Sequence, residues 1–201
     1  MKIELDHFLI DESYGGNQEW FSDSWMKIGG CGAVTACDLC ICLAKYKDMK
    51  RLCPFDPETV SLEKYLEFGM QMKKYLSPRM TGIHKTSIYV DGFNEYLKDV
   101  GVHTLGLENI SGDEDLATAV ELVKDQIDRG FPIPYLMLLH TDKRLDDYMW
   151  HWFLLNGYDE SDGAFLVSVV SYGRKIWMDL NHLWNTGKIR KGGFVRIFQR
   201  D

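Results

Sequence analysis

The sequence predicts an α+β protein in which most helices precede an antiparallel sheet. Before residue 130, apolar residues recur at helical spacing or form long runs without Gly or Pro. After residue 130, β-rich runs alternate with turn residues. Helices and strands segregated along a chain are typical of the α+β class. We therefore expect a central helix that begins at Cys31, and further helices, to pack on one side of a C-terminal antiparallel sheet.

The individual elements follow from local patterns. Residues 2–10 are expected to be extended, and residues 13–30, rich in Gly, Asn, Ser and Asp, to form a loop. Ser77–Pro78 ends the second helix and Gly130 the fourth. The expected helices lie at 31–46, 57–76, 89–100 and 114–129, with a strand at 101–110. The β-rich runs lie at 131–140, 150–159, 164–172 and 192–200, with a helical turn at 179–184.

Composition indicates one globular domain, residues 1–201, with a helical part up to about 130 and a sheet part from about 131. Apolar residues make up 45% of the chain and charged residues 26%. The net charge of −7 argues against nucleic acid and anionic membranes as partners, since both require clustered Lys and Arg. The first residues lack the apolar core of a targeting signal, and no apolar run is long enough to span a bilayer. We expect a cytoplasmic protein.

Five cysteines crowd into the first 53 residues, and four of them lie within twelve positions. Cys37 and Cys40 form a CxxC motif, which permits a metal-binding or thiol-redox interpretation. The motif lies in the middle of the expected helix, without a second ligand pair. Core packing of reduced thiols is the favoured interpretation, with no metal, cofactor or disulfide framework.

Cys31 is the candidate nucleophile. It lies in the sequence GGCGA, residues 29–33, directly before the expected helix. The positive end of a helix dipole stabilises a thiolate, and the free N–H groups there are able to bind an oxyanion. Flanking glycines let a substrate backbone approach. Alternatively, Cys31 is one more small buried residue at the start of a cysteine-rich helix.

His151 is the candidate base. It lies in the sequence WHWFLLNGYD, residues 150–159, which we interpret as a strand ending in a turn at Asn156–Gly157. Imidazole is the side chain best suited to take a proton from a thiol near neutral pH. The alternative is a buried histidine without a catalytic role.

Together these motifs resemble the papain-like cysteine peptidases, especially the bacterial double-glycine, bacteriocin-processing peptidases. Members of that group share a Cys–Gly that opens a central helix and a later His strand that ends in Gly-Tyr. The matching segments here are Gly30–Ala33 and His151–Asp159, with the strand at 132–136 before the latter. The resemblance implies a papain-like fold with Cys31 as nucleophile and His151 as base.

The resemblance also implies an oxyanion donor and a third residue that orients the histidine. Gln18 is the candidate oxyanion donor, with Asn17 as the alternative, although it lies 13 residues before Cys31, farther than is usual. The family places Asn or Asp on the strand after the histidine, and this sequence has neither there. Ser168 is the nearest polar candidate and Ser171 the next.

We therefore expect a cysteine hydrolase that cleaves a peptide or other amide bond through an acyl-enzyme. An acyltransferase is a variant of this hypothesis. Because a serine stabilises an imidazolium less well than a carboxylate does, a catalytically degenerate domain that acts as a binding module is the second hypothesis. A thiol-redox or metal protein is the third.

Overall fold

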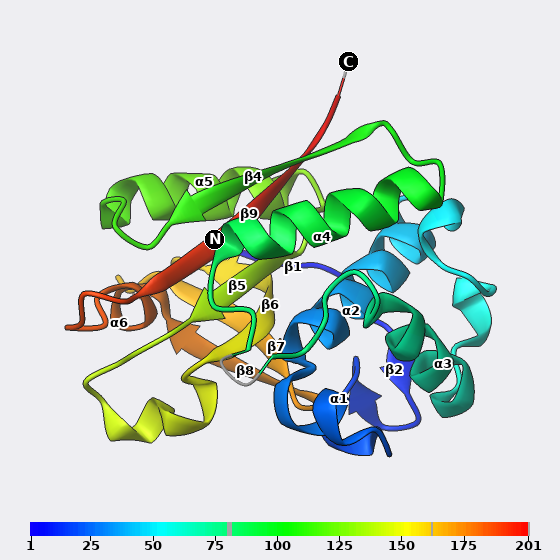
Figure 1. Cartoon of the computed structure of the whole chain (residues 1–201). Helices are drawn as coiled ribbons and strands as arrows, with labels where there is room; N and C mark the ends of the chain where they lie inside the picture. Colours follow the sequence, from blue (N-terminus) through cyan, green and yellow to red (C-terminus); the bar gives the residue numbers. More distant parts are fainter. Residues whose placement is uncertain (80–81, 162, 201) are drawn as a thin grey trace.

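One seven-stranded antiparallel sheet forms the centre of the protein (Figure 1). The computed structural model describes residues 1–79, 82–161 and 163–200. Six strands pair in the order β4-β9-β5-β6-β7-β8, and β1 pairs with the end of β6. Their bounds are β1 Lys2–Glu4, β4 Leu105–Ser111, β5 Ile133–Met137, β6 His151–Asp159, β7 Leu166–Ser171, β8 Arg174–Asp179 and β9 Gly192–Gln199. The expected α+β class with an antiparallel sheet is confirmed.

The four expected helices and the expected helical turn are present. They are α2 Cys31–Tyr46, α3 Leu62–Met72, α4 Thr86–Asp99, α5 Leu116–Asp128 and α6 Leu180–Trp184. Four 3-10 turns accompany them, η1 Gln18–Trp20, η2 Lys50–Leu52, η3 Pro57–Thr59 and η4 Lys143–Tyr148, together with the hairpin of β2 Leu9–Ile10 and β3 Ser13–Tyr14.

The stretch at 13–30 is not the simple loop that its composition predicts. It contains a short helix, α1, at Ser24–Gly29. Asp23 caps this helix, because its carboxylate accepts a hydrogen bond of 2.9 Å from the backbone N–H of Met26. Capping and the burial of Met26 stabilise a helix too short to produce an apolar periodicity in the sequence.

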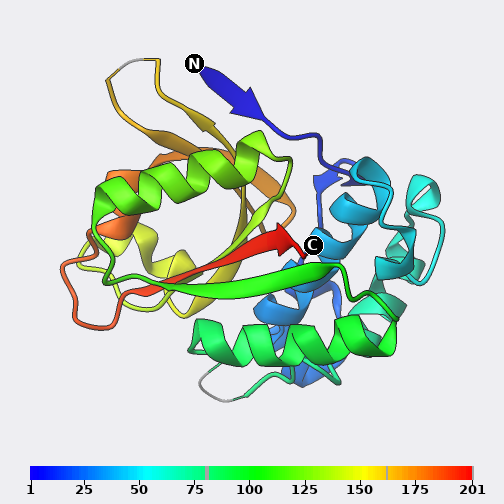
Figure 2. The same cartoon turned by 90° about the horizontal axis from the view of Figure 1, so that it is seen from above.

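Helices cover both faces of the sheet, which corrects the expectation that they lie on one side. Trp152 and Leu154 of β6 belong to the core under α2, α3 and α4. Phe153 and Leu155 point the opposite way, into the core under α5 and α6. Figure 2 shows the β4–β9 pair between α4 and α5. The physical reason is that β6 is buried continuously from residue 151 to 158, so both of its faces need apolar partners.

The sheet also contains strands that precede residue 130. β1 and β4 both precede residue 130, and β4 pairs with β9 along seven residues, from Leu105 opposite Gln199 to Ser111 opposite Gly193. The sheet therefore combines strands from both sides of residue 130.

Strand β6 continues through Asn156 and Gly157, where the sequence predicts a turn. The pairing of β6 with β7 shifts register between Leu155 and Gly157, which is a bulge rather than a turn. The Asn156 side chain donates to the carbonyl of Leu5 at 2.7 Å. A Cβ at Gly157 would lie 2.6 Å from the carbonyl oxygen of Ile3. The Asn-Gly pair therefore lets the N-terminal segment approach the sheet closely.

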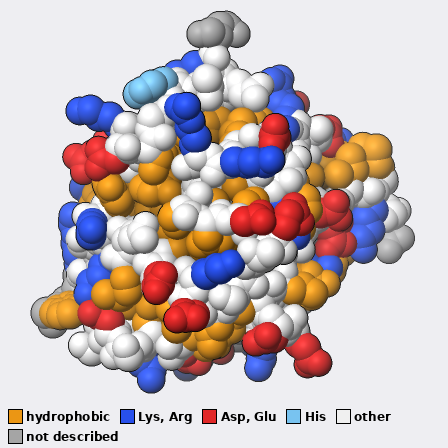
Figure 3. Space-filling model, turned by 90° about the vertical axis from the view of Figure 1, so that its right-hand side faces the viewer, with side chains coloured by type: hydrophobic (Ala, Val, Ile, Leu, Met, Phe, Trp, Pro, Cys, Tyr) orange, Lys and Arg blue, Asp and Glu red, His pale blue; other side chains and the backbone are white. Residues whose placement is uncertain are grey.

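Opposite charges are interspersed on the face of the molecule shown in Figure 3, among scattered apolar side chains. Ion pairs at the surface include Lys45 with Glu58 at 3.1 Å. Within the described residues, no helix combines the length and apolar character needed to cross a membrane.

Gly30 alone separates α1 from α2. Its N–H donates to the carbonyl of Met26 at 2.9 Å, which closes α1, and its own carbonyl accepts from Val34 at 2.9 Å, which opens α2. A Cβ at Gly30 would lie 2.4 Å from the Met26 carbonyl oxygen. This residue must therefore be glycine for sharp entry into α2, and the entry places Cys31.

We predict that Gly30→Ala lowers the free energy of unfolding by about 2–4 kcal/mol, because the methyl group overlaps backbone that has no room to move. Urea unfolding followed by circular dichroism measures the change. Gly163→Ala is the control: its added Cβ meets no heavy atom within 4 Å, so only the strain of its φ of +80° remains, which costs about 1 kcal/mol. Equal losses in the two variants would contradict the close approach at Gly30.

Candidate active site

Cys31 is the first residue of α2 and lies inside the protein. Its exposed fraction is 4%. The backbone N–H groups of Trp152, Gly32 and Cys31 itself surround the thiol and favour its ionised form. A Cβ at Gly32 would lie 2.9 Å from the Ile83 side chain. The glycine after Cys31 thus permits tight packing at the start of α2, in addition to the substrate access that the sequence suggested.

His151 is the first residue of β6 and is equally enclosed, with an exposed fraction of 6%. The residue before it, Trp150, has a φ of 55°. A bulky residue in this left-handed region is strained, and such strain is concentrated at functional sites. The backbone N–H of Trp150 donates to the carbonyl of Leu138 at 3.0 Å, which ties the strained residue to the residue that follows β5.

The structure brings Cys31, His151 and Gln18 to one small cavity, although 120 residues separate the thiol from the imidazole. The volume of this inner cavity is about 10 Å³, close to the smallest space that holds one water molecule. Trp152 and Tyr172 complete its walls. In the described chain no hydrogen bond joins Cys31 to His151, so the two groups share the cavity without direct pairing.

Enclosure favours the neutral forms of both groups. Burial lowers the pKa of His151 from 6.5 to about 3. Burial also raises the pKa of the Cys31 thiol, against the smaller opposite effect of the surrounding N–H groups. Desolvation therefore outweighs the helix N-terminus here. At pH 7 the enclosed pair is a thiol and a neutral imidazole.

Gln18 is anchored beside the cavity at the start of η1. Its side-chain N–H donates to the carbonyl of Lys27 at 3.0 Å, while its Oε1 is buried without a hydrogen-bond partner. The amide keeps a second N–H for another acceptor. The alternative, Asn17, caps η1 by accepting from Glu19 at 2.9 Å and lies outside the inner cavity. Of these two residues, only Gln18 lines the inner cavity together with Cys31.

Ser171, not Ser168, contacts the histidine, which corrects the first choice from the sequence. The Oγ of Ser171 lies 2.7 Å from the Nε2 of His151. Ser168 lies opposite Gly157, and its Oγ is buried without a partner. The bulge in β6 shifts the register of its pairing with β7. Before the bulge, Leu154 lies opposite Val170, and this register places Ser171, the residue after Val170, near His151.

Tyr172 closes the site, a role that the sequence analysis missed. Its ring stacks on the His151 ring, with centroids 4.4 Å apart and planes inclined by 3°. Its hydroxyl donates to the carbonyl of Asp147 at 3.1 Å. The same hydroxyl lies 3.3 Å from Nδ1, but it approaches the face of the imidazole, so the in-plane lone pair of Nδ1 is not engaged.

The position of Tyr172 in the chain is itself informative. Tyr172 and Gly173 form the two-residue turn between β7 and β8, with φ values of 52° and 71°. Such turns favour Asn-Gly, because both residues adopt positive φ. A tyrosine at the first position costs about 1 kcal/mol of local strain. This departure from turn chemistry is a signal of a tertiary role that the sequence carries and that our sequence analysis did not use.

Asp38 holds the segment that carries Gln18. It lies on α2 two turns after Cys31 and also lines the inner cavity. Its carboxylate accepts from the Gly16 N–H at 3.1 and 3.2 Å and from the Tyr65 hydroxyl at 2.6 Å. Burial, opposed by these two hydrogen bonds, raises the pKa of Asp38 from 3.8 to about 7.

We predict a pH-dependent difference in stability between the wild type and Asp38→Asn. The raised pKa means that the native state holds a proton more tightly than the unfolded state, so this group stabilises the protein most at low pH. That contribution is lost as pH rises from about 4 to 7. The free energy of unfolding of the wild type should fall relative to Asp38→Asn by roughly 2–4 kcal/mol over that range.

Urea unfolding of both proteins at several pH values between 4.5 and 7.5 measures this difference. Groups that titrate in the same way in both proteins cancel from it. A difference that stays constant with pH would mean that Asp38 titrates normally.

The remaining cysteines lie away from the inner cavity. All five are free thiols, and Cys37 and Cys40 have no exposed surface. Burial, followed by the proximity of other acidic groups, raises the pKa of both. Among the described residues, no group of three His, Cys, Asp or Glu side chains has an arrangement that would hold a metal ion. The CxxC pair packs in the core, as the sequence favoured.

No known protein family and no curated protein matches the sequence.

Proposed function

We propose that the protein is a papain-like cysteine hydrolase that cleaves a peptide or other amide bond, with Cys31 as nucleophile and His151 as base. The observation that carries the proposal is the meeting of Cys31, at the start of a buried helix, with His151 and Gln18 around one cavity. The same residue types in the same chain order characterise the family that the sequence resembles. Strained Trp150 and Tyr172 beside the histidine support a functional site.

The proposed reaction begins when the cavity opens and solvent or substrate enters. The Nε2–H of His151 donates to the Ser171 hydroxyl, which leaves the lone pair on Nδ1 as the base. Nδ1 takes the Cys31 proton, and the thiolate attacks the carbonyl carbon. The oxyanion is stabilised by the Cys31 N–H and the free N–H of Gln18. The imidazolium then protonates the leaving amine, and water hydrolyses the thioester to release the acid.

A serine in place of the family's Asn or Asp reduces the stabilisation of the imidazolium. The Ser171 hydroxyl fixes the tautomer but carries no charge. A Cys–His pair tolerates this loss better than a Ser–His pair, because a thiol ionises more readily than an alcohol. Ser171 is therefore proposed as a positioning residue.

One observation favours the second candidate function, a binding module without activity. The inner cavity is very small, and burial favours the neutral forms of Cys31 and His151, which both line it. If the cavity never opens, Cys31 is one more buried core thiol. The reactivity of Cys31 distinguishes the two functions.

We predict that iodoacetamide alkylates Cys31 rapidly well below pH 8, and that His151→Ala abolishes this low-pH reactivity. In the open site, a thiolate paired with an imidazolium reacts at pH values at which an ordinary thiol is protonated. Peptide mass spectrometry assigns the label to Cys31 and uses the buried Cys37 and Cys40 as internal references. Slow alkylation with an ordinary thiol titration, unchanged in His151→Ala, would support the binding module instead.

We further predict that Ser171→Ala slows alkylation of Cys31 at pH 6.5 by about fivefold, the equivalent of the roughly 1 kcal/mol that a hydrogen bond contributes. The matched variant is Ser168→Ala, on the same strand, which removes a hydroxyl that has no partner. It should leave the rate unchanged. If both variants behave alike, Ser171 does not position His151.

A further inference from the structure

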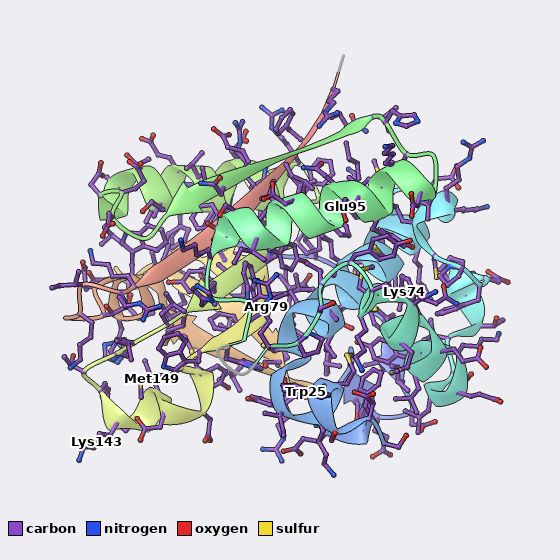
Figure 4. All side chains as sticks on the ribbon, viewed as in Figure 1. Trp25, Lys74, Arg79, Glu95, Lys143 and Met149 are labelled. Carbon is purple, nitrogen blue, oxygen red and sulfur yellow. The ribbon has the colours of Figure 1, made fainter. Side chains whose placement is uncertain are left out.

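A second, larger cavity adjoins the inner one on the surface. Its volume is about 340 Å³. Asn17 and Glu19 of the η1 segment, Asp147 and Tyr148 of η4, and the hairpin at 171–174 form its walls. Figure 4 labels Lys143 and Met149 around η4, along the same lower edge of the molecule as Trp25 of α1. We call this space the outer cavity.

Tyr172 is the wall between the outer and inner cavities, since it and Ser171 line both. On the inner side its ring covers His151. On the outer side its hydroxyl donates to the Asp147 carbonyl at 3.1 Å, and its carbonyl accepts from the Asn17 side chain at 3.5 Å. Both hydrogen bonds are made to residues of the outer cavity. A ligand bound there competes for the groups that hold Tyr172 closed.

The charged side chains of the outer cavity favour a cation. Glu19 and Asp147 bring two negative charges and Arg174 one positive charge. In the described part of the chain, none of these three side chains forms an ion pair. The pKa of Tyr172 is raised mainly by burial and further by the proximity of the acidic groups of Cys31, Asp147 and Glu19. The carboxylates of Asp147 and Glu19 therefore lie close enough to Tyr172 to influence its hydroxyl electrostatically.

We propose that the outer cavity is the substrate-entry site for Cys31, that it prefers a substrate carrying a cationic group, such as a Lys or Arg side chain, and that Tyr172 must swing out to connect it to the nucleophile. This inference rests on the proposed function for its substrate class. The movement of Tyr172 does not depend on the proposed function. A positively charged segment enters between Glu19 and Asp147, and the scissile carbonyl follows through the space that Tyr172 vacates.

A pair of charged thiol reagents of similar size tests the proposal. Methanethiosulfonates that carry an ethyltrimethylammonium or an ethylsulfonate group both react with a thiolate, forming a mixed disulfide and releasing methanesulfinate. The measured quantity is the ratio of the cationic to the anionic labelling rate at Cys31, assigned by mass spectrometry. We expect this ratio in the wild type to exceed the same ratio measured with free 2-mercaptoethanol, which corrects for the intrinsic reactivities of the two reagents. Asp147→Asn should lower it about two- to threefold, the effect of one exposed charge near the path at moderate salt.

Asp6→Asn is the matched control, because it makes the same chemical change near Tyr46, at the far end of α2 from Cys31. It should leave the ratio unchanged. Arg174→Gln should raise the ratio. Equal ratios in Asp147→Asn and Asp6→Asn would overturn the outer cavity as the entry path.

Tyr172→Asn tests the wall, since Asn suits the left-handed turn and preserves the hairpin. Both reagents should label Cys31 at least tenfold faster in this variant, and the ratio should persist. Unchanged rates would overturn the role of Tyr172. The ratio cancels the intrinsic reactivity of the thiol. It therefore tests the entry site, whereas the pH profile in His151→Ala tests the proposed hydrolase. An ordinary pH profile with a charge-dependent ratio would reject the hydrolase and keep the entry site.

Discussion

The burial of α2 is the constraint on which the rest of the structure depends. Fourteen of its sixteen residues are buried, and Gly, Ala and Cys make up much of its first three turns. Small side chains let β6 and α3 approach the helix closely, and this approach fixes Cys31 beside the start of β6. The abrupt entry through Gly30 follows from the same requirement, because α1 must end where α2 begins.

The packing that positions the candidate catalytic pair also suppresses its ionisation. In the interior, the loss of solvation disfavours a thiolate and an imidazolium more strongly than nearby N–H groups favour them. Reactivity therefore depends on opening, and Tyr172 is the element that must move. Its left-handed turn conformation stores strain that the stack on His151 and the bond to Asp147 offset. Closure thus depends on a few weak contacts rather than on the core.

The N-terminal segment links the site to the rest of α2 through Asp38. A carboxyl group that accepts one shared N–H from Gly16 and the hydroxyl of Tyr65 is an unusual anchor for a loop, because its burial makes it titrate near neutral pH. The same segment pairs β1 with the bulged end of β6. The residues before Gln18 are therefore held at both ends, which gives the oxyanion candidate a defined position despite its long separation from Cys31.

The sequence by itself determined the start of the central helix at Cys31, the strand that begins at His151 and the general order of helices and strands. These features depend on local periodicity and on turn residues, which short segments carry. Only the tertiary structure decided that Ser171 rather than Ser168 contacts His151, that Tyr172 closes the site and that helices cover both faces of the sheet. These depend on a bulge that shifts strand register and on packing between residues far apart in the chain, and neither leaves a periodic pattern in the sequence.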